Sequence, residues 1–124
     1  ISSAEYLGTV SAWNALRGRT LERFNDVDIV LCPATMIAAK PLSDAQSSIE
    51  RYSELNLGYL RNTAIGNILN LCGLSIPCGH TDEGLPIGLM LYARPFGERN
   101  LLRAGAAFQS ASDSHNQFPT MDWL

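Results

Sequence analysis

The chain has 124 residues, of which 46% are hydrophobic and 17% charged, which is typical of one folded domain and unlike a disordered segment. Its net charge of −3 and pI near 5.2 argue against binding to nucleic acid or to an anionic membrane surface. No apolar run approaches the roughly 20 residues that cross a bilayer, and no secretory signal is visible. We therefore expect no nucleic-acid or membrane partner.

The first predicted element is an amphipathic helix over residues 3–25. Ser2 and Glu5 have the spacing of a capping box, in which a hydroxyl and a carboxylate cap the first free backbone N–H groups. Apolar side chains then recur at roughly helical spacing: Tyr6, Val10, Trp13, Leu16, Leu21 and Phe24.

A short strand is predicted next, over residues 28–33. This run is continuously apolar after Asp28, rich in β-branched residues and stopped by Pro33, as in a strand that is buried on both faces. Residues 34–46 show no periodicity and contain Pro41, so they are predicted to form a loop.

A second helix is predicted from Ile49 to Leu71. Ser47 and Glu50 repeat the capping-box spacing at its start, and apolar residues follow with helical periodicity. Gly58 and Gly66 are positions at which this helix could kink or divide.

Two strands and a third helix complete the pattern. Residues 74–78 and 86–92 are continuously apolar, which predicts interior strands, and the polar turn between them carries Asp82 and Gly84. The helix begins at Gly97 and Glu98, where a carboxylate suits the positive helix end. Its apolar face is formed by Leu101, Leu102, Gly105 and Phe108.

The predicted order is therefore α-β-α-β-β-α. This order predicts an α/β fold, in the form of a layered α/β/α fragment with a short mixed sheet. Residues 1–112 are expected to form the domain, and residues 113–124 a loosely ordered tail.

Residues that could carry chemistry are few, and none is surrounded by a recognisable catalytic pattern. The nearest match to a nucleophile elbow places Ser75 inside a predicted strand and ends in Pro77. His80 and His115 are expected to be exposed, and Lys40 precedes Pro41 in a polar loop. The nucleotide-binding motifs GxxxxGK[ST] and GxGxxG and the zinc motif HExxH are absent, so no cofactor or metal is expected.

The three cysteines, Cys32, Cys72 and Cys78, form no CxxC pair and have no clustered histidines. An odd number of cysteines in apolar surroundings indicates reduced, buried thiols, as in a cytoplasmic protein. Burial would also make these thiols poor nucleophiles.

The order of these segments resembles the carboxy-terminal part of amidase-signature hydrolases. In that family a strand led by Asp closes in Pro-Thr, as Asp28 and residues 32–35 do here with one extra Ala. Thr63 and Asn67 have the family's spacing, and residues 74–79 and 84–89 match its last two strands. Glu98, Leu101 and Leu102 match the helix that follows. Asn70, Cys72, Gly73 and Met90 depart from the residues usual in the family. The pattern Asn-x4-Cys-Gly-Leu-Ser-x-Pro, which runs from Asn67 to Pro77, is similar to the allophanate and biuret hydrolases or aryl-acetamidases.

The resemblance implies an amide hydrolase whose catalytic residues lie outside this chain. Family members use a nucleophilic Ser, a second Ser held by a cis peptide, a Lys and a Gly-Gly-Ser-Ser-Gly loop, and none of these has a match here. It further implies that Thr35, Met36 and Cys72 line the acyl pocket of the complete enzyme, where a small amide would bind.

Two other interpretations remain open at this point. The chain could be a stand-alone, non-enzymatic module derived from an amidase tail, or an independent enzyme that uses a Cys or Lys40. Interior-type strands without neighbours would leave sheet edges and an apolar face exposed, so we also expect self-association through that face or edge.

Overall fold

The computed structural model describes residues 1–118 and contains an α/β fold. Its helices are α1 (Ser3–Arg23), α2 (Leu42–Ala45), α3 (Ile49–Leu69) and α4 (Glu98–Ser110), and its strands are β1 (Val30–Pro33), β2 (Cys72–His80) and β3 (Pro86–Ala93). The predicted order α-β-α-β-β-α is confirmed, with the one-turn helix α2 added inside the predicted loop. A 3₁₀ helix, η1 (Ser114–Asn116), follows α4.

The sheet has the order β1-β3-β2, and both of its strand pairs are antiparallel. The prediction of a mixed sheet was wrong in this respect for the described residues. Continuous hydrophobicity predicted interior strands, and β3 has this position, because it lies in the centre of the sheet and is covered on both faces. Leu91, which pairs with Leu31 of β1 and Leu74 of β2, is only 3% exposed.

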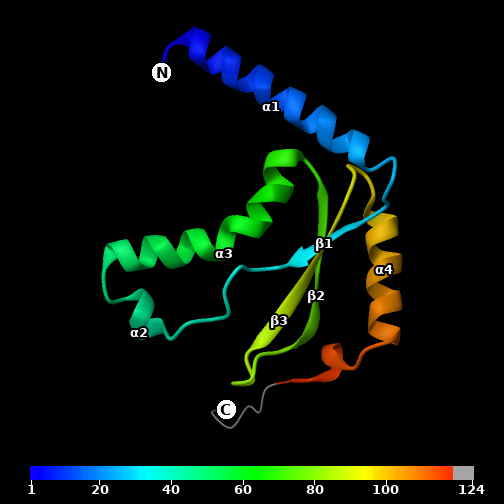
Figure 1. Cartoon of the computed structure of the whole chain (residues 1–124). Coiled ribbons are helices and arrows are strands. Elements are labelled where there is room, and N and C mark those ends of the chain that lie inside the picture. Colours follow the sequence, from blue (N-terminus) through cyan, green and yellow to red (C-terminus); the bar gives the residue numbers. More distant parts are fainter. Residues whose placement is uncertain (119–124) are drawn as a thin grey trace.

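Helices lie on the two opposite faces of this sheet (Figure 1). On one face, α4 packs on β2 and β3, and Ile76, Leu91, Ala93 and Leu101 form the buried core. On the other face, the Tyr92 hydroxyl donates to the backbone carbonyl of Asn62 in α3 at 2.7 Å. The predicted α/β/α layering is therefore present.

Helix α3 is continuous through both of its glycines. Its N-cap is Ser48, whose hydroxyl accepts from the Arg51 backbone N–H, so the capping box predicted at Ser47 and Glu50 does not form. Gly66 lies against the Tyr92 ring, where a Cβ atom would come within 2.5 Å of Cε1. The close approach of α3 to the sheet is therefore the reason for a glycine in mid-helix.

Asn62 joins α3 to β1. Its side chain is buried, and its amide nitrogen donates to the backbone carbonyl of Pro33 at 2.7 Å. One residue later, the Ala34 N–H donates to the backbone carbonyl of Gly88 in β3 at 2.8 Å, which extends the hydrogen-bond ladder between β1 and β3. The end of β1 is thus held from two sides.

Helix α1 begins with the predicted capping box between Ser2 and Glu5. It projects from the rest of the molecule (Figure 1) and has no buried residue. Its only side-chain hydrogen bonds to another element among the described residues come from Trp13 and Arg17, which both donate to the Ile68 carbonyl. The Arg17 guanidinium also stacks on the Trp13 ring, 4.4 Å from its centroid. These contacts place a positive charge at the negative carboxyl end of α3.

The segment from residue 113 onward was predicted to be a loosely ordered tail. Within the described residues, η1 contacts β2, and His115 is half-buried rather than exposed as predicted. Residues 119–124 of the predicted tail lie outside the described residues.

Candidate functional site

A groove of about 500 Å³ lies where the segment after β1 meets the neighbouring ends of β2 and β3. Its walls come from residues 34–39, from the last part of β2, from the first part of β3 and from one side chain of α3. The lining residues are Ala34, Thr35, Ile37, Ala38, Ala39, Tyr59, Ser75, Ile76, Pro77, Pro86, Ile87 and Gly88.

Local hydrogen bonds hold the wall formed by residues 34–39. The Thr35 hydroxyl donates to the Ile37 carbonyl at 2.8 Å, which closes a tight turn directly after the strand. The Tyr59 hydroxyl accepts from the Lys40 backbone N–H at 3.0 Å. Helix α3 therefore fixes the far end of the wall, although this segment has no regular secondary structure.

The groove is apolar apart from three hydroxyl groups, on Thr35, Tyr59 and Ser75, and none of its lining side chains carries a charge. Such a surface suits an uncharged organic group, because it has no side chain to compensate a buried ionic charge.

The structure separates the three predicted pocket residues. Thr35 lines the groove, whereas Met36 does not and is half exposed. Cys72 lies at the opposite end of β2, on the face covered by α4, where its thiol donates to a carboxylate oxygen of Glu98 at 3.2 Å. That these three residues line the acyl pocket of a complete enzyme stays a prediction.

Tyr59, Ser75 and Gly88 line the groove but were not predicted as site residues. Tyr59 was assigned to the apolar face of a helix, and Ser75 to a strand. The one signal in the sequence was the residue type at the ends of the last two strands. Ser75, Pro77, Pro86 and Gly88 are small or ring-closed residues that leave space where larger side chains would fill it.

Burial and hydrogen bonds shift a few pKa values near the sheet. Burial raises the pKa of the Cys32 thiol, as expected for an unreactive cysteine. Glu98 has a lowered pKa because its own backbone N–H and then the Cys72 thiol donate to its carboxylate. Burial also raises the pKa of Tyr92, whose hydroxyl is directed to α3.

No catalytic dyad is formed within residues 1–118. None of their hydrogen bonds joins a hydroxyl or thiol to a His or Lys side chain, and both Lys40 and His80 are exposed. The same residues contain no cluster of three His, Cys, Asp or Glu side chains that could hold a metal ion. No helix among them is long and apolar enough to span a membrane.

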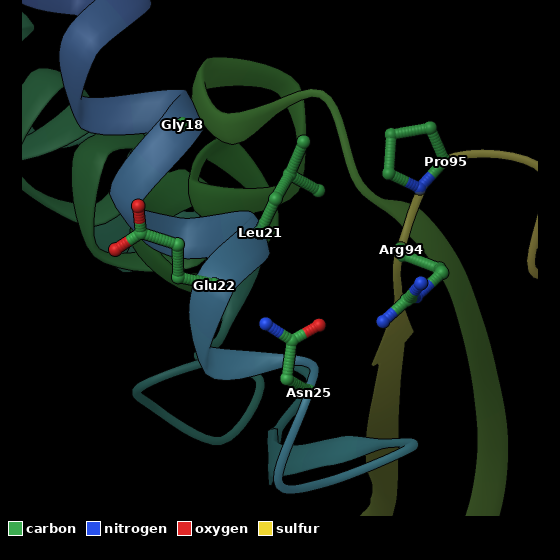
Figure 2. A pocket seen from close by; sticks show the side chains of 6 residues that line it. All are labelled: Gly18, Leu21, Glu22, Asn25, Arg94 and Pro95. Carbon is green, nitrogen blue, oxygen red and sulfur yellow. The ribbon is translucent and has the colours of Figure 1, made fainter.

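A second hollow, of about 420 Å³, lies between the carboxyl end of α1 and the segment that follows β3. Figure 2 shows the Arg94 and Asn25 side chains directed into it, while the Glu22 carboxylate points away. The Arg94 guanidinium donates to the Phe24 carbonyl at 2.6 Å. This contact ties the end of α1 to the sheet, so we assign the hollow a structural role.

Comparison with known proteins identifies the family. The family described as Amidase matches residues 2–102. The chain belongs to the amidase family. The match covers both walls of the groove and the helices that support them, as the sequence resemblance predicted.

Several proteins of known name are similar to this chain over part of their length. Fatty acid amide hydrolase from Oryza sativa subsp. indica is 37% identical over 89 residues, which are 71% of this chain and 15% of that protein. A glutamyl-tRNA(Gln) amidotransferase subunit from Geotalea daltonii is 36% identical over 99 residues, or 78% of this chain and 19% of the relative. The 2-amino-5-chloromuconic acid deaminase of Comamonas testosteroni is 32% identical over 102 residues, which are 82% of this chain and 22% of that protein.

The fold agrees with that of part of a solved structure. A variant of allophanate hydrolase from Kluyveromyces lactis matches 93% of this chain with a TM-score of 0.73 and 20% identity, and the match covers 18% of that protein. The chain thus spans about a fifth of the length of the relatives it matches. It corresponds to part of an amidase domain.

Proposed function

We propose that this chain is the carboxy-terminal portion of an amide hydrolase and supports a catalytic centre that other parts of the domain supply. The family match over residues 2–102 carries the proposal. It also agrees with the lack of a nucleophile paired with a base among the described residues. In the complete enzyme, hydrolysis would proceed through a serine nucleophile and a lysine outside this chain, as the family resemblance implies.

The groove beside Thr35 supplies the second part of the proposal, which is that it holds the acyl portion of the substrate. Its apolar walls and three hydroxyl groups favour an acyl group without formal charge. The names of the relatives mention fatty acid amides, glutamyl-tRNA(Gln) and 2-amino-5-chloromuconic acid, so they do not select one substrate.

We also propose that the enzyme acts in the cytoplasm. The support is that Cys32, Cys72 and Cys78 are all free thiols, as is usual in a reducing compartment.

The full-length product of the reading frame that encodes these residues tests the catalytic proposal. It should release ammonia from primary amides and react with a fluorophosphonate probe, whereas the 124-residue chain alone should do neither. A reading frame without a Gly-Gly-Ser-Ser-Gly loop and an upstream Lys would overturn the proposal, as would specific labelling of the isolated chain.

The acyl-pocket assignment is tested by filling the groove in that same full-length product. Ala38→Phe should lower kcat/KM for the amides with the longest uncharged acyl groups by about tenfold or more, with a smaller effect on acetamide. Ala106→Phe, on the outer face of α4, is the matched control and should change neither. Equal substrate profiles for the two variants would show that the groove does not bind the acyl group.

A further inference from the structure

The face of the sheet that carries α4 is only partly covered. An α-helix with its side chains is about 10 Å wide and strands lie about 4.8 Å apart, so one helix covers roughly two strands. Helix α4 packs on β2 and β3. Leu31 of β1 is consequently 58% exposed, although its partner in the ladder, Leu91, is 3% exposed.

The uncovered strip forms a groove between β1 and the flank of α4. One section, of about 230 Å³, is lined entirely by apolar side chains: Ile29, Leu31, Ile76, Leu89, Leu91, Ala104 and Phe108. A neighbouring section of about 430 Å³ shares Ile29 and Ala104 and ends at the charged residues Asp28 and Arg103. We call these two sections together the α4–β1 groove.

The flank of α4 along this groove carries two alanines, between Asn100 and Arg103 on one side and Phe108 on the other. Ala104 and Ala107 line it, and Asn100 continues the same stripe one turn earlier. Small side chains at spacings of three and four allow another helix to approach closely. The groove thus has an apolar floor, a helical wall in which Ala104 and Ala107 leave space, and the charged residues Asp28 and Arg103 at one end.

We propose that the α4–β1 groove is occupied by an amphipathic helix from the remaining part of the amidase domain, lying beside α4 and over β1. The inference rests on the proposed function in one respect, namely that this chain is one part of a larger domain. About four-fifths of each relative's length lies outside the region that matches this chain. We place the docked helix in that unmatched part of the domain. The occupant's apolar stripe would face Leu31 and Phe108, and its polar positions would face Asp28 and Arg103.

Two neighbouring alanines of α4 provide a matched pair for the test. Ala107 lines the groove and Ala106 does not, yet both are exposed in this chain. In the full-length product, Ala107→Glu should lower the melting temperature by about 5 °C or more, because it places a carboxylate against the docked helix. Ala106→Glu should change the melting temperature by less than about 2 °C. In the isolated chain, the two variants should have the same melting temperature.

A labelling experiment covers the case in which Ala107→Glu fails to fold. Ala107→Cys should react with a maleimide at least about tenfold more slowly than Ala106→Cys in the full-length product, and equally fast in the isolated chain, with the site read by mass spectrometry. Equal protection of both positions in the full-length product would overturn the proposal. Protection of position 107 that appears only in the isolated chain and grows with concentration would overturn it in favour of a second copy.

The two proposals can fail separately. Amide hydrolysis with no difference between positions 106 and 107 would remove the docked helix and leave the proposed function. Selective protection of position 107 without hydrolysis would leave the docked helix and remove the proposed function.

Discussion

Glycine in mid-helix has opposite roles in α1 and α3. A Cβ atom on Gly8 would meet nothing within 4 Å, whereas one on Gly66 would collide with the Tyr92 ring. We expect Gly8→Ala to raise the free energy of unfolding by about 0.5–1 kcal/mol and Gly66→Ala to lower it by about 1–3 kcal/mol. Denaturant unfolding of both variants checks this. If both substitutions raised the free energy of unfolding, the Tyr92 ring would be able to move away from the added methyl group without loss of stability.

Asn62 is the buried polar residue that connects α3 to β1. Asn62→Ala should lower the free energy of unfolding by about 1–2 kcal/mol, because the Pro33 carbonyl loses its donor. Asn67→Ala, at an exposed position of the same helix, is the control and should change it by less than about 0.5 kcal/mol. Similar losses in both variants, measured by urea titration, would mean that the hydrogen bond contributes little.

Residue type alone could not identify Asn62 or Tyr59 in advance. Both lie within a run of helical periodicity, and their roles depend on which turn of α3 passes over the end of β1. Thr35 could be predicted as a groove residue because it directly follows a strand and matches a family motif. Cys72 was grouped with it through the same resemblance, yet it points to the other face of the sheet, since alternate residues of a strand face opposite sides.

At the scale of elements, periodicity and caps were sufficient for most of the chain. The Ser2 capping box, the apolar runs of β2 and β3 and the Gly84 turn are local signals, and each gave the right element. Helix α2 was missed because four residues are too few to show a period. The antiparallel β1–β3 pairing was missed because it joins segments about 60 residues apart in the sequence, and strand direction has no local signal.

The stability that the junction of α2 and α3 contributes to the fold should depend on pH. Arg51 donates two hydrogen bonds to the Asp44 carboxylate, at 2.9 and 2.8 Å, and these lower the pKa of Asp44 below its usual value of 3.8. A lowered pKa in the folded state gives stability that is present above pH 3.8 and is lost as the pH falls through the folded value.

Asp44→Asn should therefore be less stable than the parent protein at pH 6, and the difference in stability should shrink as the pH falls below 3.8, the ordinary pKa of an aspartate. Thermal unfolding of both proteins across this range measures the gap. Glu5, Glu83 and Glu98 also have lowered pKa values, but their contribution cancels in the difference. A gap that does not change with pH would rule out the ion pair as its cause.

At the scale of the molecule, many large apolar side chains of the described residues are exposed, as on a surface that contacts another protein segment. Leu7, Leu31 and Phe96 are 65%, 58% and 95% exposed, and α1 buries none of its residues. We propose that the isolated chain self-associates through these surfaces, as was expected from its unpaired strands. Sedimentation across a range of concentrations should show species larger than a monomer, and a monodisperse monomer would contradict the proposal.

The hydrogen bond from Asn62 to Pro33 has a consequence for how the sheet can grow. Because Ala34 donates to β3, the backbone groups of Pro33 point to the opposite, open side of β1. Pro33 has no N–H that could donate to an added strand, and its carbonyl already accepts a hydrogen bond from the Asn62 side chain. A strand added beyond β1 must therefore be displaced towards Ile29 and Leu31. The mouth of the groove beside Thr35 would then stay free of that strand and open to a substrate.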